Sequence, residues 1–217
     1  MQLKLYGYWR SSAAYRIRIA LNLKQLKYEL APVDLRKGEQ HHEELKSRNP
    51  QAMLPVLTHG DRVFRQSMAI IEYLDETFEG RGYRLMPVEL RERARVRAIS
   101  QTLACDIHPL NNLRVLGALE TRFGASEVQQ QDWMRHWMHL GFAALETLLA
   151  ENPSTGEFCE GDAPTMADCC LIPQVYNALR FNLDMLPFPT IERIYRTALA
   201  LPEFAAAQPE SQPDASA

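Results

Sequence analysis

The order of strands and helices in the first 80 residues constrains the fold more than any other feature of this sequence. Apolar and polar residues alternate over residues 3–7, which predicts a strand, and a polar turn follows it. An apolar stripe with helical spacing then runs from Ala13 to Leu21. Residues 28–33 predict a second strand. A β-α-β order requires that the two strands pair in parallel through a right-handed crossover.

A hairpin and another helix are expected next. Residues 34–48 are charged and weakly helical, and a strand is predicted over residues 54–58, where Pro55 stands at the tolerated start position. Turn residues then lead into a short partner strand over residues 62–64. Ser67 is expected to cap the following helix. Together these elements predict a small mixed sheet with helices packed on it.

The pattern changes at residues 80–87, which break both periodicities, and no convincing strand follows. An α/β domain over residues 1–81 and an all-helical domain over residues 88–217 are therefore expected. The polar, proline-rich end, QPESQPDASA, is expected to fray. Helices are expected over residues 88–119, 127–150, 165–180 and 190–200.

Charge and cysteine content exclude several function classes. The formal net charge is −3, so no global positive field draws the chain to nucleic acid or to a membrane surface. No apolar run fits a signal sequence or a membrane span, so the cytoplasm is the expected location. The four cysteines include no CxxC pair, which predicts buried, reduced thiols rather than disulfides or a zinc site. His136 and His139 lack further ligands, so no metal site is expected.

Ser11 and Ser12 lie in the turn between the first predicted strand and the first predicted helix. Their hydroxyls and the unpaired N–H groups of the first helical turn converge on one point, where a thiolate would be stabilised. Each unit by which a thiol pKa falls corresponds to about 1.4 kcal/mol. The alternative is a simple N-cap, which position alone favours.

Five segments of the sequence occur in the order YWRSSAAYRIRIALNLK, NPQAMLPVL, QSMAIIEYLDE, CDIHPLNNLRVL and TMADCCLIPQVYNALRF. Together they resemble the zeta class of the glutathione transferases, including its bacterial maleylacetoacetate isomerases. The resemblance runs from about residue 3 to about residue 204. It implies a thioredoxin-like α/β N-terminal domain followed by an all-α C-terminal domain, with glutathione as cofactor and a homodimeric assembly.

The resemblance also implies roles for individual residues. Ser11, Ser12 and Arg10 would carry the catalysis, and a cis Leu54-Pro55 bond would present the backbone of Leu54 to the cysteinyl part of glutathione. The implied contacts to glutathione are Gln40, Leu54, Pro55, Gln66, Ser67, His108 and Asn112, and the implied partners of a dicarboxylate substrate are Arg10, Arg114 and Arg180.

Three of these residues have plainer interpretations when the resemblance is set aside. Ser67 reads as a helix cap, His108 as a hydrogen-bonded packing residue beside the kink expected at Pro109, and Arg180 as a cation near a helix C-terminus. Ala13 stands where many zeta enzymes carry a cysteine. This departure leaves the sulfur of glutathione as the nucleophile.

The implied reaction is the glutathione-dependent isomerisation of maleylacetoacetate to fumarylacetoacetate, a step of tyrosine and phenylalanine breakdown. Arginines would stabilise the charge that develops on the carbonyl side of the substrate. Maleylpyruvate isomerase is the first alternative, and a general conjugating or dehalogenating transferase is the second. A non-catalytic binding module is the third, but such a module has no need of Ser11, Ser12, Gln66 and Ser67.

Overall fold

The computed structural model describes residues 2–216, which divide into two compact units. The first unit runs to Met86 and resumes at Leu199, and the second is Pro87–Ala198. The expectation of a continuous second domain over residues 88–217 is therefore wrong at its C-terminal end, because the chain from Leu199 onward packs with the first unit. None of the helices between residues 2 and 216 is long and apolar enough to cross a membrane.

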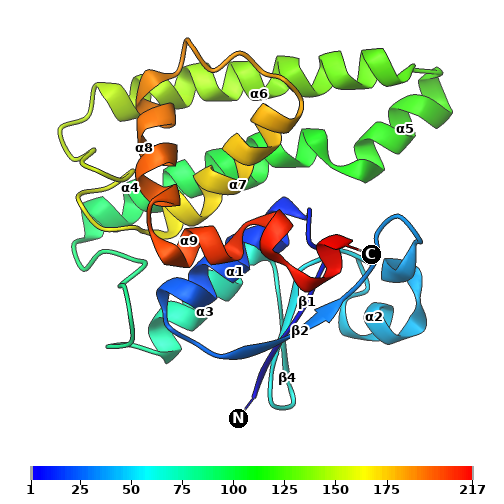
Figure 1. Cartoon of the computed structure of the whole chain (residues 1–217), viewed down its shortest axis with the longest axis horizontal. Helices are drawn as coiled ribbons and strands as arrows, with labels where there is room; N and C mark the ends of the chain where they lie inside the picture. Colours follow the sequence, from blue (N-terminus) through cyan, green and yellow to red (C-terminus); the bar gives the residue numbers. More distant parts are fainter. Residues whose placement is uncertain (1, 217) are drawn as a thin grey trace. The chain divides into compact units, whose positions relative to one another are not determined.

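The first unit contains the mixed sheet that the sequence predicts (Figure 1). Its strand order is β2-β1-β3-β4, in which β1 pairs in parallel with β2 and antiparallel with β3. The third strand begins two residues later than expected, because Pro55 offers no N–H to the ladder. The strands are β1 Leu3–Gly7, β2 Tyr28–Pro32, β3 Val56–His59 and β4 Arg62–Arg65.

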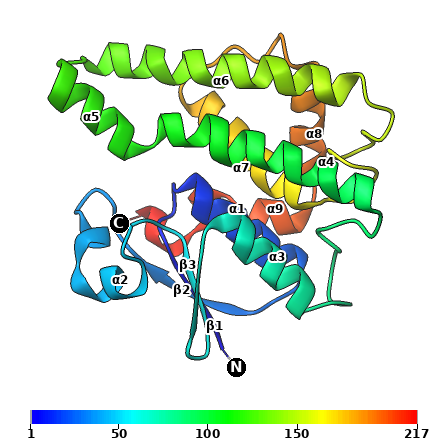
Figure 2. The same ribbon diagram turned by 180° about the vertical axis from the view of Figure 1, so that it is seen from behind.

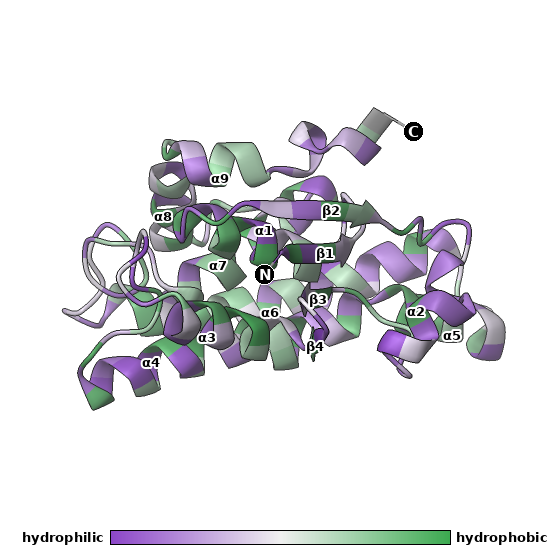
Figure 3. Ribbon diagram, turned by 90° about the horizontal axis from the view of Figure 1, so that it is seen from below, coloured by the Kyte–Doolittle hydropathy of each residue, from purple (hydrophilic) through white to green (hydrophobic). Residues whose placement is uncertain are grey.

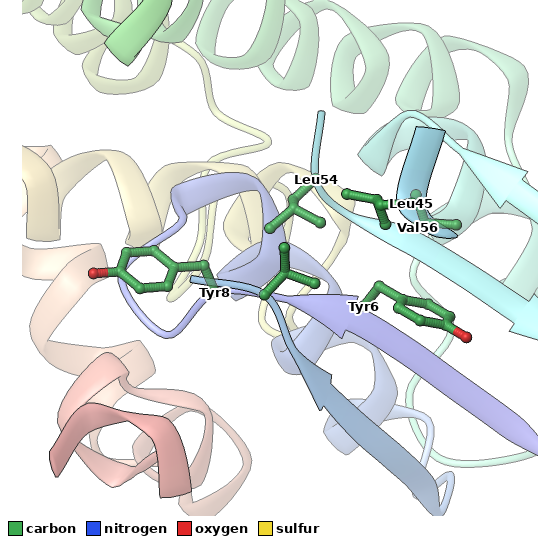
Figure 4. Packing of buried hydrophobic residues seen from close by; sticks show 6 residues of the cluster. Tyr6, Tyr8, Leu45, Leu54 and Val56 are labelled. Carbon is green, nitrogen blue, oxygen red and sulfur yellow. The ribbon is translucent and has the colours of Figure 1, made fainter. Parts of the chain in front are cut away.

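Helices cover both faces of this sheet. A Cβ added to Gly7 would lie 3.2 Å from the Cβ of Ala14, so this face of β1 packs closely against α1. Tyr6 and Tyr8 point to the other face, where they form a buried cluster with Leu45 of α2 (Figure 4). α1 also packs against α3 and α9. These helices are α1 Ser12–Leu23, α2 Glu43–Arg48, α3 Ser67–Thr77 and α9 Pro202–Ala207.

Three basic side chains at α1 are buried, although arginine and lysine are among the residues least often found inside proteins. Arg16, Arg18 and Lys24 are each at most 2% exposed. Lys24 Nζ lies 3.0 Å from Asp75 Oδ1, and the carboxylate of Asp75 also accepts the backbone N–H groups of Leu85 and Met86. Buried charges persist only where partners of this kind compensate them.

The second unit is helical, with α7 nearly buried along its whole length. α6 runs beside the segment from η2 to α5 (Figure 2), and α4 mixes hydrophilic and hydrophobic residues (Figure 3). A capping box starts α7, since Thr165 and Asp168 bond each other's backbone groups. The helices are α4 Leu90–Gln101, η2 Thr102–Ile107, η3 His108–Asn111, α5 Leu113–Phe123, α6 Glu127–Ala150, α7 Met166–Arg180 and α8 Pro189–Leu199.

The single helix expected over residues 88–119 is wrong. The α-helix ends at Gln101, continues as one π-helical and one 3-10 segment, and a new helix starts after Asn112. Pro109 supplies the physical reason, because it has no N–H to donate and its ring clashes with the preceding turn. The kink predicted at Pro109 is thus a complete interruption of the α-helix.

The expectation that the C-terminal end frays is also wrong for residues 208–216, and Ala217 lies outside the described residues. Two 3-10 turns, η4 Pro209–Ser211 and η5 Pro213–Ser216, continue from α9 within the first unit. The buried side chain of Gln212 donates to the carbonyl oxygens of Ala206 and Gln208, at 3.0 and 2.8 Å. Side-chain bonds to the backbone stabilise this polar segment, which has too few apolar residues for composition to reveal it.

Candidate active site

Ser11 is the N-cap of α1, as its position in the sequence indicates. Its Oγ accepts a hydrogen bond from the N–H of Ala14 at 3.2 Å, and its own N–H donates to the carbonyl of Tyr8 at 2.9 Å. The side chain is half-buried. Because the hydroxyl oxygen acts as the acceptor of the cap, the hydroxyl proton remains able to donate to a ligand.

The first turn of α1 offers further donors beside this hydroxyl. Within residues 2–216, no group accepts a hydrogen bond from the N–H of Ser12 or of Ala13, or from the hydroxyl of Ser12. No Asp or Glu lies in this turn to neutralise the positive end of the helix dipole. The arrangement suits an anion such as a thiolate.

Arg10 brings a positive charge to the same turn. Its guanidinium lies 4.6 Å from the centroid of the Trp9 ring, a cation–π contact that holds the side chain without neutralising it. No carboxylate of the described chain forms an ion pair with it. Arg10 can therefore pair with the carboxylate of a ligand.

The Leu54-Pro55 peptide bond is cis, as the resemblance implied. Leu54 is buried in the cluster that contains Tyr6 and Tyr8, and Figure 4 shows its side chain beside that of Leu45. Its backbone N–H and C=O have no hydrogen-bond partner among residues 2–216. Leu54 can thus give one donor and one acceptor to a peptide ligand.

α3 begins at Ser67, and its N-cap is Gln66 rather than Ser67. Gln66 occupies the N-cap position with a φ of 67°, and its side chain bonds Gln51 at 3.2 Å. Ser67 is the first helical residue, so the prediction that it caps the helix is wrong. Its Oγ accepts instead from Nη1 of Arg16, at 3.1 Å.

Arg16 is the site residue that sequence reasoning missed. It is 2% exposed, and it brings a guanidinium to the start of α3, where the unpaired N–H groups of a helix already favour an anion. The available signal was an arginine one turn after the two serines, in a helix that is otherwise largely apolar.

Gln40 lies in the short turn η1 Glu39–His41 and is half-buried. Its Oε1 is buried and accepts no hydrogen bond from the described part of the chain. A buried acceptor without a donor costs free energy, so such an atom is commonly completed by water or by a ligand.

The remaining predicted site residues lie in the second unit. His108 is half-buried at the start of η3, and the exposed Arg180 ends α7 with its guanidinium 4.7 Å from the centroid of the Phe181 ring. Asn112 caps α5 by accepting the N–H of Arg114 at 3.1 Å. Arg114 is exposed on α5.

The second unit also contains a buried thiol and carboxylate that are structural. Burial raises the pKa of Cys159 well above its ordinary value, and the neighbouring Asp168 raises it further. Burial likewise raises the pKa of Asp168, while the N–H groups of Cys159 and Thr165 that it accepts oppose this. Cys159 therefore remains an unreactive thiol.

No three His, Cys, Asp or Glu residues within 2–216 gather into a set that could hold a metal ion. His136 packs on Trp137 with ring centroids 5.1 Å apart, and His139 packs on Phe188 at 5.4 Å. Both histidines serve side-chain packing within the second unit.

A four-stranded mixed sheet with a cis-proline before β3, joined to a helical second unit, is the fold of the glutathione transferases. Residues 1–76 match the family described as "Glutathione S-transferase, N-terminal domain". The chain is 51% identical to a probable maleylacetoacetate isomerase of Vibrio cholerae, over 99% of both chains. It is 44% identical to a maleylpyruvate isomerase of a Ralstonia species, over 98% of this chain and 99% of that one.

Solved structures that are similar to this chain carry the same names as these relatives. A zeta-class maleylpyruvate isomerase, solved in its holo form, matches with a TM-score of 0.94 and 44% identity, over 97% of this chain and 99% of that one. A maleylacetoacetate isomerase of Methylobacterium extorquens, solved with malonate and glutathione bound, matches with a TM-score of 0.93 and 42% identity, over 99% and 100%. The chain belongs to the zeta class of the glutathione transferase family.

Proposed function

We propose that this protein is an enzyme that uses glutathione to isomerise maleylacetoacetate to fumarylacetoacetate. The observation that carries the proposal is the start of α1, where the N-cap residue Ser11 and two unpaired amides can receive a thiolate. Relatives named maleylacetoacetate isomerase support the substrate, at 51% identity in Vibrio cholerae and 46% in Rhizobium meliloti.

The polar groups of the first unit fit glutathione, an anionic tripeptide with a thiol. When bound, glutathione supplies the thiolate that adds to the double bond and later leaves it. Ser11 donates its hydroxyl proton to the sulfur, because its oxygen is already held by Ala14, and Ser12 offers its amide and a second hydroxyl. The backbone of Leu54 pairs with the cysteinyl peptide.

The γ-glutamyl end of glutathione belongs at the start of α3. Ser67 and the amides of this first turn hold its carboxylate. The guanidinium of Arg16, which bonds the hydroxyl of Ser67, adds positive charge at this position. Gln66 stands beside this position, and the unsatisfied Oε1 of Gln40 accepts an N–H of the tripeptide. His108 and Asn112 of the second unit are proposed as further contacts.

Arginines bind and orient the dicarboxylate substrate. Arg10 holds the carboxylate at the reacting end, since its guanidinium is stacked on Trp9 but forms no ion pair within the described chain. Arg114 and Arg180 are proposed as partners for the remaining carboxylate. Related structures hold malonate, or citrate beside a dicarboxyethyl glutathione, which suits a carboxylate site of this kind. Two fixed carboxylates would decide which bond rotates.

Maleylpyruvate is the second candidate substrate, because the Ralstonia relative at 44% identity is named for it. An assay of the purified protein with each substrate, with and without glutathione, separates the two candidates. We expect turnover of maleylacetoacetate that depends on glutathione and exceeds that of maleylpyruvate. Faster turnover of maleylpyruvate would reverse the assignment. Conjugation or dehalogenation without isomerisation would indicate a general transferase, and no turnover of any substrate would indicate a binding module.

We further propose that the enzyme is a homodimer that works in the cytoplasm in the breakdown of tyrosine and phenylalanine. In the dimer, the N-terminal domain of one subunit would contact the helical domain of its partner. Three of the four cysteines are buried, and all four are free thiols, as expected in a reducing compartment. Sedimentation at micromolar concentration tests the assembly, and a monomer would contradict it.

A further inference from the structure

The turn that carries Arg10 and Ser11 is held by the C-terminal segment. Both backbone groups of Trp9, the residue before Arg10, are bonded by side chains. Its N–H donates to Oδ2 of Asp214 at 3.0 Å, and its carbonyl accepts from Nη2 of the buried Arg18 at 2.9 Å. Nε of the same Arg18 donates to the carbonyl of Ala207 at 3.0 Å. Two contacts therefore connect this turn to residues 202–216, one through Asp214 directly and one through Arg18.

The C-terminal segment is itself firmly built, so these contacts do not belong to a loose end. The side chain of Phe204 is fully buried, and Pro209 is buried as well. Nδ2 of Asn22 on α1 donates to the carbonyl of Glu203 at 2.9 Å. Gln212 closes the two 3-10 turns by bonding the carbonyls of Ala206 and Gln208. The position of Asp214 is thereby defined.

The ring of Trp9 packs beside the buried cluster of Tyr6 and Tyr8, but among residues 2–216 only Asp214 and Arg18 bond its backbone. Its internal hydrogen bond runs from the N–H of Ser11 to the carbonyl of Tyr8. The guanidinium of Arg10 rests on the ring of Trp9, so a rotation of Trp9 carries Arg10 with it. The peptide of Trp9 also sets the direction in which the chain enters Ser11. Displacements of about 1 Å in catalytic groups can slow a reaction by about a hundredfold.

We infer that Asp214 is a positioning residue of the active site, which orients Arg10 and Ser11 by holding the backbone of Trp9. The kinetic test of this inference rests on the proposed function, because kcat is measured for the proposed isomerisation. Oδ1 of Asp214 is buried without a hydrogen-bond partner among residues 2–216, so the carboxylate bonds this turn through Oδ2 alone. An asparagine at this position would keep one oxygen to accept the N–H of Trp9.

Two truncations and two substitutions test the inference. One truncated chain ends at Asp214 and the other at Pro213, so both lose the bond from Ala215 to Gln212 and they differ only in Asp214. We expect the chain that ends at Pro213, and Asp214→Ala, to lower kcat by about ten- to a hundredfold. The KM for glutathione should stay near that of the wild type, since Leu54 and Ser67 lie elsewhere. The chain that ends at Asp214, and Asp214→Asn, should retain most of kcat.

Three results would overturn the inference. The first is an unchanged kcat in Asp214→Ala. The second is a loss that Asp214→Asn does not restore. The third is an equal decline of kcat, glutathione affinity and thermal midpoint, which would mean a merely structural role. If the wild-type protein does not isomerise either substrate, the proposed function fails. The pH titration of the bound glutathione thiolate by ultraviolet absorbance then decides, with an upward shift expected in Asp214→Ala and none in Asp214→Asn.

Discussion

Replacing Ser11 by alanine removes two interactions that can be measured separately. The hydroxyl oxygen accepts the N–H of Ala14 at 3.2 Å, and we propose that the hydroxyl proton is donated to the sulfur of glutathione. The first interaction stabilises the fold, and the second stabilises the bound thiolate. Ser12→Ala is the control for the stability measurement, since no described residue bonds the hydroxyl of Ser12 and its loss removes no helix cap.

The expected magnitudes follow from these two interactions. Loss of an N-cap lowers the free energy of unfolding by about 0.5 to 2 kcal/mol. Loss of one donor to a charged acceptor costs about 1.5 to 3 kcal/mol, which raises the pKa of the bound thiol by roughly one to two units. The amides of Ser12 and Ala13 remain, so part of the stabilisation of the thiolate should survive. Glutathione should still bind through Leu54 and Ser67.

Two measurements on the same variants separate these effects. Urea unfolding gives the stability, and the ultraviolet absorbance of the glutathione complex against pH gives the pKa of the thiol. We expect Ser11→Ala to lose stability and to titrate at higher pH, with a fall in kcat larger than the fall in glutathione affinity. Ser11→Thr keeps the hydroxyl and should resemble the wild type in both measurements.

The reasoning about Ser11 would be refuted by a thiolate titration that is unchanged in Ser11→Ala but shifted upward in Ser12→Ala. The donor would then be Ser12, and Ser11 would be a cap alone. If neither variant shifts the titration, the proposed role of the serines in stabilising the thiolate is wrong altogether.

Three other expectations concern single side chains. Arg10→Ala should lower kcat/KM for the dicarboxylate by about ten- to a hundredfold and leave the thiolate titration unchanged; a shifted titration would contradict its assignment to the substrate. In the native protein, Ellman's reagent should modify one thiol, that of the exposed Cys105, because the others are buried and burial raises the pKa of Cys159. A second fast thiol would disprove this, and Cys105→Ser should abolish the reaction. Asp75→Asn leaves the charge of Lys24 buried without its carboxylate, so urea unfolding should show a loss of about 3 to 5 kcal/mol. A loss below about 1 kcal/mol would mean that water reaches this pair.

Local patterns in the sequence were sufficient for much of the first unit. The alternation over residues 3–7 and the apolar stripe that follows predict β1 and α1, since both periodicities arise within a few residues. The N-cap at Ser11 and the capping box at Thr165 are equally local. The cis bond at Pro55 came from the family resemblance, because sequence alone would favour the trans form.

The sequence by itself thus determined the strands of the first unit, their order, the helices that follow β1 and β4, and the serines at the start of α1. Only the tertiary structure decided which charges are buried and what holds the turn before α1. Hydrogen bonds join residues that are distant in the sequence: Arg16 and Ser67 are 51 positions apart, Arg18 and Ala207 are 189 apart, and Asp214 and Trp9 are 205 apart. Periodicity reports only which face of an element a residue occupies. The partner that compensates a buried charge lies far away in the sequence, so only the folded structure identifies it.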